Sequence, residues 1–211
     1  VDIMKKKMLK TISYLSVILF VLFLGINVKA NSINSIKMDV YIDSYGNAHV
    51  TEVWDAYLDE GTEGYRAYTD LEGAYISDFK VSDEVREYTT TSYWNTSASF
   101  NEKAYKAGIN KISDGYELCF GISRYGNNTY TMKYTITNFV SELTDSQMIY
   151  WTLVPHNFSN TIGKAYIKIH TNFDIEDTID VWGYGDYGGT AYVYDGYIEM
   201  QKRQVEGFKK L

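Results

Sequence analysis

The stretch NTYTMKYTITNFV, residues Asn128–Val140, alternates large apolar side chains with threonine and lysine along most of its length. The side chains of a β-strand point to opposite faces with a period of two, so this pattern sends one set into a core and the other into solvent. Threonine, tyrosine and isoleucine also suit a pleated, half-buried surface. The stretch therefore predicts a central strand of an antiparallel sheet.

Shorter segments of the same character recur between residues 36 and 200, separated by turns rich in glycine, asparagine and aspartate. Strand runs bounded by such turns are typical of an all-β domain. The other predicted strands are Ile36–Ile42, Ala48–Tyr57, Tyr65–Thr69, Tyr75–Val81 with a bulge, Arg86–Trp94, Lys103–Ile112, Gly115–Ile122, Thr161–Thr171, Thr178–Trp182 and a hairpin over Ala191–Met200. Ser141–Gln147 has helical character. We expect a single antiparallel β-sandwich of roughly 9–11 strands, preceded by an N-terminal hydrophobic signal helix.

The first thirty residues have the layout of a secretory signal peptide. Four lysines between residues 5 and 10 precede the uncharged stretch Thr11–Val28, and small residues flank Lys29 at the expected cleavage site. An uncleaved signal anchor is the alternative, because the 18 uncharged residues reach the lower limit of a bilayer span. Ser13 and Ser16 favour cleavage. Both alternatives place residues 31–211 outside the cytoplasm.

The last eleven residues, QKRQVEGFKKL, turn basic and have the pattern of an amphipathic helix that has only begun. The expected organisation is a signal peptide or signal anchor at residues 1–30 and an extracytoplasmic β-sandwich domain at residues 31–200. Residues 201–211 are then the start of a truncated C-terminal extension. Attachment to the membrane would come from the signal anchor or from a missing C-terminal segment.

The charge of the chain excludes one class of partner. The whole sequence carries −7, and residues 1–30 hold five lysines and one aspartate, so residues 31–211 carry −11. An acidic domain repels nucleic acid and anionic membrane surfaces. We therefore expect no nucleic-acid partner, and a secreted or membrane-associated extracytoplasmic location.

Side chains that carry out catalysis or bind metals are sparse. The three histidines, His49, His156 and His170, lie far apart and outside any metal-binding motif, and His49 and His170 are expected on a solvent-facing side of the strands. Cys119 lies in an apolar run and is expected to be a small buried hydrophobe. We predict no catalytic residue, metal ligand or cofactor, and we favour a protein that is not an enzyme.

Two short motifs resemble functional ones and are better explained as local structure. Gly121–Tyr125 begins like a nucleophile elbow around Ser123, but Tyr125 stands where that turn requires a second glycine. Asp43–Asn47 resembles a calcium loop but lacks the further oxygen ligands, so a plain hairpin turn is expected. The many carboxylates leave a glycosidase pair open, although nothing marks a particular pair.

The candidate binding residues are aromatic side chains beside glycines. Trp182, Tyr184 and Tyr187 lie in the stretch WGYGDYGG, and rings presented on such a loop can form a flat platform for a sugar ring or a peptide. The alternative is that Trp182 and Tyr184 cap the core while the glycines form turns. A second stretch, Tyr93-Trp94-Asn95, is a candidate for the same role.

The order of these motifs resembles that of bacterial predicted membrane proteins with domain of unknown function 2207. The segments that carry the resemblance are Met38–Trp54, Ile76–Val81, Trp94, Lys103–Asn110, Gly115–Ile122, Tyr130–Val140, Tyr150-Trp151 and Trp182–Gly189. The resemblance implies an exported N-terminal β domain followed by membrane helices. It implies no catalytic residues, because the family has no established activity.

Three functions remain open at this point. The first is a non-enzymatic module that binds or senses a ligand at the cell envelope, with an envelope protein or a cell-wall glycan as partner. The second is a carbohydrate-active enzyme or wall-glycan-binding domain that uses Trp182, Tyr184 and Tyr187. The third is a structural part of an envelope complex, which an exposed apolar patch would support.

Overall fold

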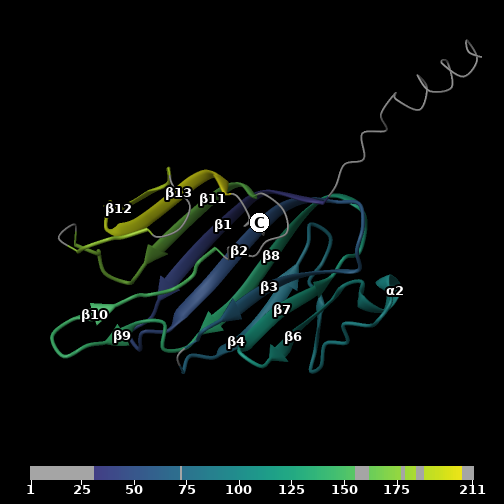
Figure 1. The fold of residues 1–211 in the computed structure, drawn as a ribbon, viewed down its shortest axis with the longest axis horizontal. Coiled ribbons are helices and arrows are strands. Elements are labelled where there is room, and N and C mark those ends of the chain that lie inside the picture. Colours follow the sequence, from purple (N-terminus) through teal and green to yellow (C-terminus); the bar gives the residue numbers. More distant parts are fainter. Residues whose placement is uncertain (1–30, 72, 155–161, 177–178, 184–187, 206–211) are drawn as a thin grey trace, which may run out of the picture.

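A computed structural model describes residues 31–71, 73–154, 162–176, 179–183 and 188–205 (Figure 1). The elements are β1 (Ser32–Ile42), β2 (Ala48–Leu58), β3 (Glu63–Thr69), β4 (Ile76–Ser82), β5 (Thr89–Thr91), α2 (Phe100–Lys103), β6 (Lys106–Ile112), β7 (Gly115–Gly121), β8 (Gly126–Ile136), β9 (Ser141–Glu142), β10 (Gln147–Met148), β11 (Ile162–His170), β12 (Thr190–Tyr194) and β13 (Tyr197–Val205). The all-β class predicted from the sequence is confirmed. The expected signal helix lies outside the described residues.

The strands form a seven-stranded sheet in the order β12-β13-β11-β1-β2-β8-β4, a four-stranded sheet in the order β3-β7-β6-β5, and a small β9–β10 ladder. In Figure 1, β12 and β13 lie at one end of the molecule, and the four-stranded sheet lies toward the other, beside β8 and β4. The expectation of a purely antiparallel sheet is wrong, because β1 pairs in parallel with β11 and β5 with β6. No tight turn joins either pair, so the direction of pairing is not set by a hairpin.

The stretch that opened the sequence analysis forms β8, between β2 and β4. Its apolar side chains Tyr130, Met132, Tyr134 and Ile136 are buried, and the residues between them point to the other face, as the alternation predicts. The strand ends at Ile136, three residues before the buried Phe139. It is an interior strand, although it is second from the edge of the sheet.

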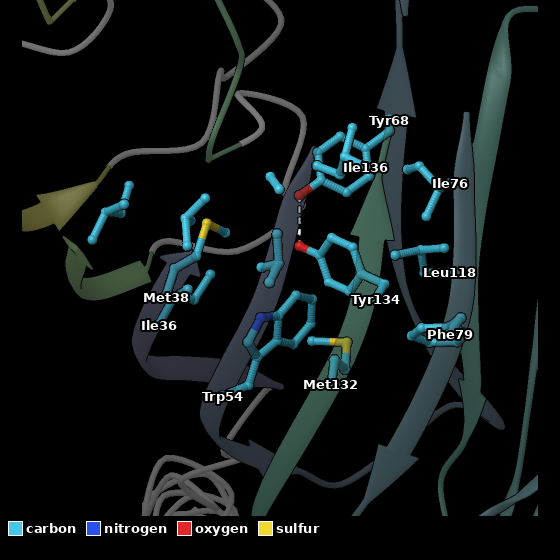
Figure 2. Close-up of a cluster of buried hydrophobic side chains, with 14 of the residues drawn as sticks. Ile36, Met38, Trp54, Tyr68, Ile76, Phe79, Leu118, Met132, Tyr134 and Ile136 are labelled. Atoms are coloured by element: carbon cyan, nitrogen blue, oxygen red, sulfur yellow. Dashed lines mark hydrogen bonds between the residues drawn. The ribbon is translucent and has the colours of Figure 1, made fainter. Parts of the chain in front are cut away.

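The core lies where the inner faces of the two larger sheets meet. Buried residues of β1, β2, β4 and β8 form one cluster with Tyr68 of β3 and with Leu118 and Phe120 of β7 (Figure 2). Trp54 meets Phe120 edge to face at a centroid distance of 6.0 Å, and Phe120 lies 4.5 Å from the ring of Tyr130. Aromatic pairs at these separations contribute about 0.5–1.5 kcal/mol beyond their buried area.

Cys119 is buried in β7, as predicted. Burial raises the pKa of its thiol to about 12, and the nearby carboxylates of Glu63 and Glu117 add to the rise. The thiol is therefore protonated at neutral pH and unreactive as a nucleophile.

Several predicted elements are confirmed with small changes in their bounds. The β1–β2, β6–β7 and β12–β13 hairpins are present, and β3 falls where Tyr65–Thr69 predicts a strand. The predicted bulge in β4 appears as a register shift between Ser77 and Lys80, where Asp78 has a positive φ of 56°. Arg86–Trp94 contains only the short strand β5, and no strand is present over residues 179–182.

Both helix expectations are corrected. Ser141–Gln147 forms most of the β9–β10 ladder, closed by a hydrogen bond from Leu143 N to Ser146 O, so its turn chemistry prevails over its helical character. Gln201–Val205 continue β13 because the strand pairs with β11, whereas an amphipathic helix was predicted there. A short helix, α2, follows the capping box of Ser99 and Glu102. Across the described ranges, no helix is both long and apolar enough to cross a membrane.

Candidate binding face

The structure describes only part of the predicted aromatic platform. Trp182 is 67 % exposed on the segment between β11 and β12, next to Val181, which packs against the core. Tyr184 and Tyr187 lie outside the described residues. In the second candidate stretch, Tyr93 is exposed, but Trp94 is buried and donates a hydrogen bond from its indole nitrogen to Glu63. Trp94 is therefore not available as a platform.

A larger candidate binding surface is the solvent-facing side of the seven-stranded sheet. It consists of the side chains that alternate with the buried ones on each strand, and we call it the outer face. One row crosses five strands and consists of Tyr194 (β12), Tyr197 (β13), His170 (β11), Tyr41 (β1) and His49 (β2). Within it, Tyr194 and Tyr197 have ring centroids 5.7 Å apart.

Tyr41 lies between two histidines because of the strand register. Tyr41 is paired with His170 on β11 and with His49 on β2, and its ring centroid lies 5.5 Å and 6.1 Å from theirs. Each histidine is held by a carboxylate: His170 Nε2 lies 2.9 Å from Asp39 Oδ1, and His49 Nε2 lies 3.0 Å from Asp43 Oδ2. The three rings therefore form a fixed, partly exposed group, and both histidines face solvent as predicted.

The Asp43–Asn47 turn fixes the position of His49. Asp43 Oδ1 accepts hydrogen bonds from the backbone N–H groups of Tyr45 and Asn47, and Gly46 provides the positive φ of 77° that closes the turn. Burial alone would raise the pKa of Asp43, but the hydrogen bonds from Asn47, His49 and Tyr45 lower it to about 2. The predicted plain hairpin turn is what the structure shows.

A neighbouring row joins tyrosine hydroxyls to a carboxylate. Glu199 accepts hydrogen bonds from Tyr166 on β11 and Tyr192 on β12, at 3.0 Å and 2.7 Å. Burial and the bond to Glu199 raise the pKa of Tyr166 to about 12. Lys168 Nζ lies 4.1 Å from the ring centroid of Tyr197, within cation–π range. The β11–β13 part of the outer face is thus ordered by its own side chains.

The β2–β8 part of the outer face contains a shallow depression of about 200 Å³. His49, Thr51, Asp78, Lys133 and Thr135 contribute to its lining. Lys80 of β4 is paired with Lys133 across the ladder, which places two exposed lysines opposite each other on the same face. Directly opposed like charges destabilise a sheet, so the pair is a feature that packing alone does not explain.

The inner face of the same sheet holds a buried ionic network. Glu52 and Arg66 are fully buried, with Arg66 Nε 3.4 Å from Glu52 Oε2. The two Glu52 oxygens accept hydrogen bonds from Trp54 Nε1 at 2.6 Å and Tyr134 OH at 2.7 Å. Arg66 lies on β3 and the other three on β2 and β8, so the network joins the two sheets.

The network extends to the segment after β10. Tyr68 OH lies 2.6 Å from Tyr134 OH, the dashed contact in Figure 2, and Arg66 donates to Tyr68 OH and to the carbonyl of Leu153. Burial raises the pKa of both Tyr68 and Tyr134, so these phenols stay protonated and act as donors. Burial disfavours the charged form of Arg66, but Tyr68 and Glu52 raise its pKa above the ordinary value.

Other motifs considered from the sequence show no catalytic arrangement. Ser123 Oγ lies 3.3 Å from Asp83 Oδ2 and 3.2 Å from Tyr88 OH, and a nucleophile elbow would instead place a histidine there. Among the described residues, no cluster of three or more histidine, cysteine or carboxylate side chains could hold a metal ion. The chemistry that the geometry supports is recognition by rings, hydroxyls and charges on an open surface.

These features define an all-β protein with an open, aromatic and charged sheet face. The chain belongs to the family described as "Predicted membrane protein (DUF2207) N-terminal domain", whose profile matches residues 32–207. No protein with a curated function matches it. The resemblance recognised from the order of motifs is therefore confirmed.

The chain is also similar, at low identity, to some solved structures. They include a proposed nutrient-binding protein of Legionella pneumophila (10 % identity, TM-score 0.47, covering 84 % of this chain and 63 % of that one). A proposed protease of Parabacteroides distasonis follows (9 %, 0.46, 87 % and 37 %), and then yeast LTA4 hydrolase (9 %, 0.45, 83 % and 27 %). This chain thus spans less than two thirds of each of them.

Proposed function

We propose that this protein is a non-enzymatic, extracytoplasmic β-sandwich module that binds a ligand at the cell envelope through the outer face. The carrying observation is the group Tyr41, His49 and His170, whose rings are partly exposed and held in place by two carboxylates. A surface preorganised in this way loses little side-chain entropy on binding.

Two further observations support the proposal. Three of the many acidic side chains hold rings of the outer face in position. Asp39 and Asp43 hold histidines, and Glu199 holds tyrosines. The family description, a predicted membrane protein, agrees with a location at the membrane, and the basic and apolar first thirty residues support export.

The test is co-sedimentation of the purified protein with isolated cell-envelope fractions. The variant Tyr41→Ala/His170→Ala removes two rings of the carrying group, and we expect it to lose most of the binding. Tyr65→Ala is the matched control, because Tyr65 is an exposed tyrosine on the four-stranded sheet. Equal binding by all three proteins would contradict the assignment of the outer face.

A second candidate keeps the predicted aromatic loop as the binding site for wall glycan. The exposed indole of Trp182 favours it. In the same assay Trp182→Ala would then abolish binding while Tyr41→Ala/His170→Ala would not. A structural role in an envelope complex predicts instead that envelope binding survives removal of the glycan and depends on an envelope protein.

A further inference from the structure

We propose that the ligand of the outer face is an anionic polysaccharide, whose chain crosses the strands along the row of rings and whose acidic groups meet the lysines beside it. This inference rests on the proposed function and names the chemistry of the ligand. It comes from the distribution of charge, from two opposed lysines that form no ion pair with a described residue, and from the shape of the surface.

The cations of this acidic chain are concentrated on the outer face. Residues 31–211 contain 15 lysines and arginines against 26 aspartates and glutamates. The strand register places six of those cations on the outer face, namely Lys37, Lys80, Lys133, Lys164, Lys168 and Arg203. It places only four carboxylates there, Asp39, Asp55, Asp78 and Glu199. Asp43 of the β1–β2 turn adds a fifth carboxylate, because it lies against His49. The face therefore carries about +1 on a domain of −11, which favours an anionic ligand.

Most of these carboxylates are already engaged by neutral or histidine partners. Asp39 pairs with His170, Glu199 accepts from two tyrosines, and Asp55 accepts a hydrogen bond from Asn34. In the part of the chain that the structure describes, none of the six cations forms an ion pair. These six positive charges are therefore available to an incoming anion.

Lys80 and Lys133 give the inference a specific location. They are cross-strand partners on β4 and β8, and Lys133 also lines the depression with Thr51 and Thr135. The repulsion between them is relieved when an anion lies between the two ammonium groups. The threonine hydroxyls beside them can bond to the hydroxyls of the same ligand.

The shape of the outer face favours a polymer as the ligand. The row from Tyr194 to His49 crosses five strands, and at the ordinary strand spacing this is a path of roughly 19 Å. Small molecules bind in concave sites that bury most of their surface, and the outer face offers only a shallow depression. An extended sugar chain can instead stack on successive rings while its acidic groups reach lysines on either side.

The remaining charge of the domain disfavours denser polyanions. Outside the outer face the domain carries about −12, and a nucleic acid duplex or an anionic membrane would lie close enough to be repelled by it. A polysaccharide with one charge per sugar unit spreads its charge over a narrow path. We therefore take the polysaccharide as the ligand, and nucleic acid and membrane as outcomes that the test can reveal.

The experiment measures binding of the full chain to polygalacturonate and to its fully methyl-esterified form, which has the same backbone without the charge. We expect binding to the acidic polymer that weakens with added salt, and about tenfold weaker binding to the ester. Lys80→Gln/Lys133→Gln should weaken binding to polygalacturonate by about the same factor. The control Lys106→Gln/Lys111→Gln removes two exposed charges from β6 and should leave the affinity nearly unchanged.

Equal affinity for the two polymers, or an equal loss in both double variants, would overturn the inference. Stronger binding to DNA or to phosphatidylglycerol vesicles than to polygalacturonate would also overturn it.

The experiments distinguish failure of the polysaccharide inference from failure of the proposed function. If envelope binding still requires Tyr41 and His170 while polygalacturonate is ignored, the binding face stands and the anionic polysaccharide is wrong. Thermal unfolding of each variant checks that it is folded.

Discussion

The two faces of the seven-stranded sheet use the same strands for opposite purposes. On β2, Glu52 faces inward and has every oxygen engaged, whereas the neighbouring His49 and Thr51 face outward and border an open depression. The inner charges are surrounded by protein, so each requires its partner, while the outer charges are solvated and can exchange water for a ligand. The comparison indicates that stability depends on the inner network and recognition on the outer face.

Glu52 and Arg66 should give the largest effect on stability. Glu52→Ala leaves the guanidinium uncompensated, and Arg66→Ala leaves the carboxylate uncompensated, so each should cost about 3–5 kcal/mol of unfolding free energy in urea titrations. The double variant Glu52→Met/Arg66→Leu should be more stable than either. If the double variant instead loses the sum of the two single effects, the charges do not act as a pair.

Tyr134→Phe tests the hydroxyl that links Glu52 to Tyr68. Its removal leaves Glu52 Oε2 and Tyr68 OH each short of one partner, and we expect a loss of about 1–3 kcal/mol, measured in the same way. Tyr116→Phe, on a half-buried tyrosine of β7, is a control for loss of a hydroxyl outside the network. Similar losses in both variants would show that the network adds nothing beyond an ordinary hydroxyl.

Asp43 should give a smaller, pH-dependent effect. Its pKa is about 2 in the folded protein against 3.8 ordinarily, so the unfolded chain takes up its proton first as the pH falls. The stabilisation is present above about pH 4 and is lost as the pH falls through about 2. Unfolding measured between pH 5 and 2 should therefore be less steep with pH in Asp43→Asn than in the wild type. Parallel curves would show that the turn does not carry this stabilisation.

Outer-face substitutions should have the smallest effect on stability. Lys133→Gln and Thr51→Ala remove side chains that face solvent on the sheet, so the unfolding free energy should change by less than about 0.5 kcal/mol. We expect Lys133→Gln to be slightly stabilising, because it removes the repulsion between two like charges that oppose each other across the ladder. A loss comparable to that of Tyr134→Phe would mean that the outer face is part of the structural core.

Individual residues show how far the sequence could predict the site. The exposure of His49 and His170 and the burial of Trp54 follow from strand alternation, which is a local property. The capping box of Ser99 and Glu102 was readable in the sequence as a start of a helix and was missed. No pattern could show that Tyr41 lies between histidines 8 and 129 residues away, since that depends on the pairing of β1 with β2 and β11.

The sequence by itself determined the all-β class, the faces of β8 and the main hairpins, because alternation and turn chemistry act over a few residues. It also determined the membership of the family, through the order of its motifs. Only the tertiary structure decided that β11 pairs in parallel with β1 and that Arg66 meets Glu52 between the sheets. These contacts join residues far apart in the chain, and they are selected by the packing of whole sheets. The row of rings and lysines on the outer face exists only once that packing has set the register.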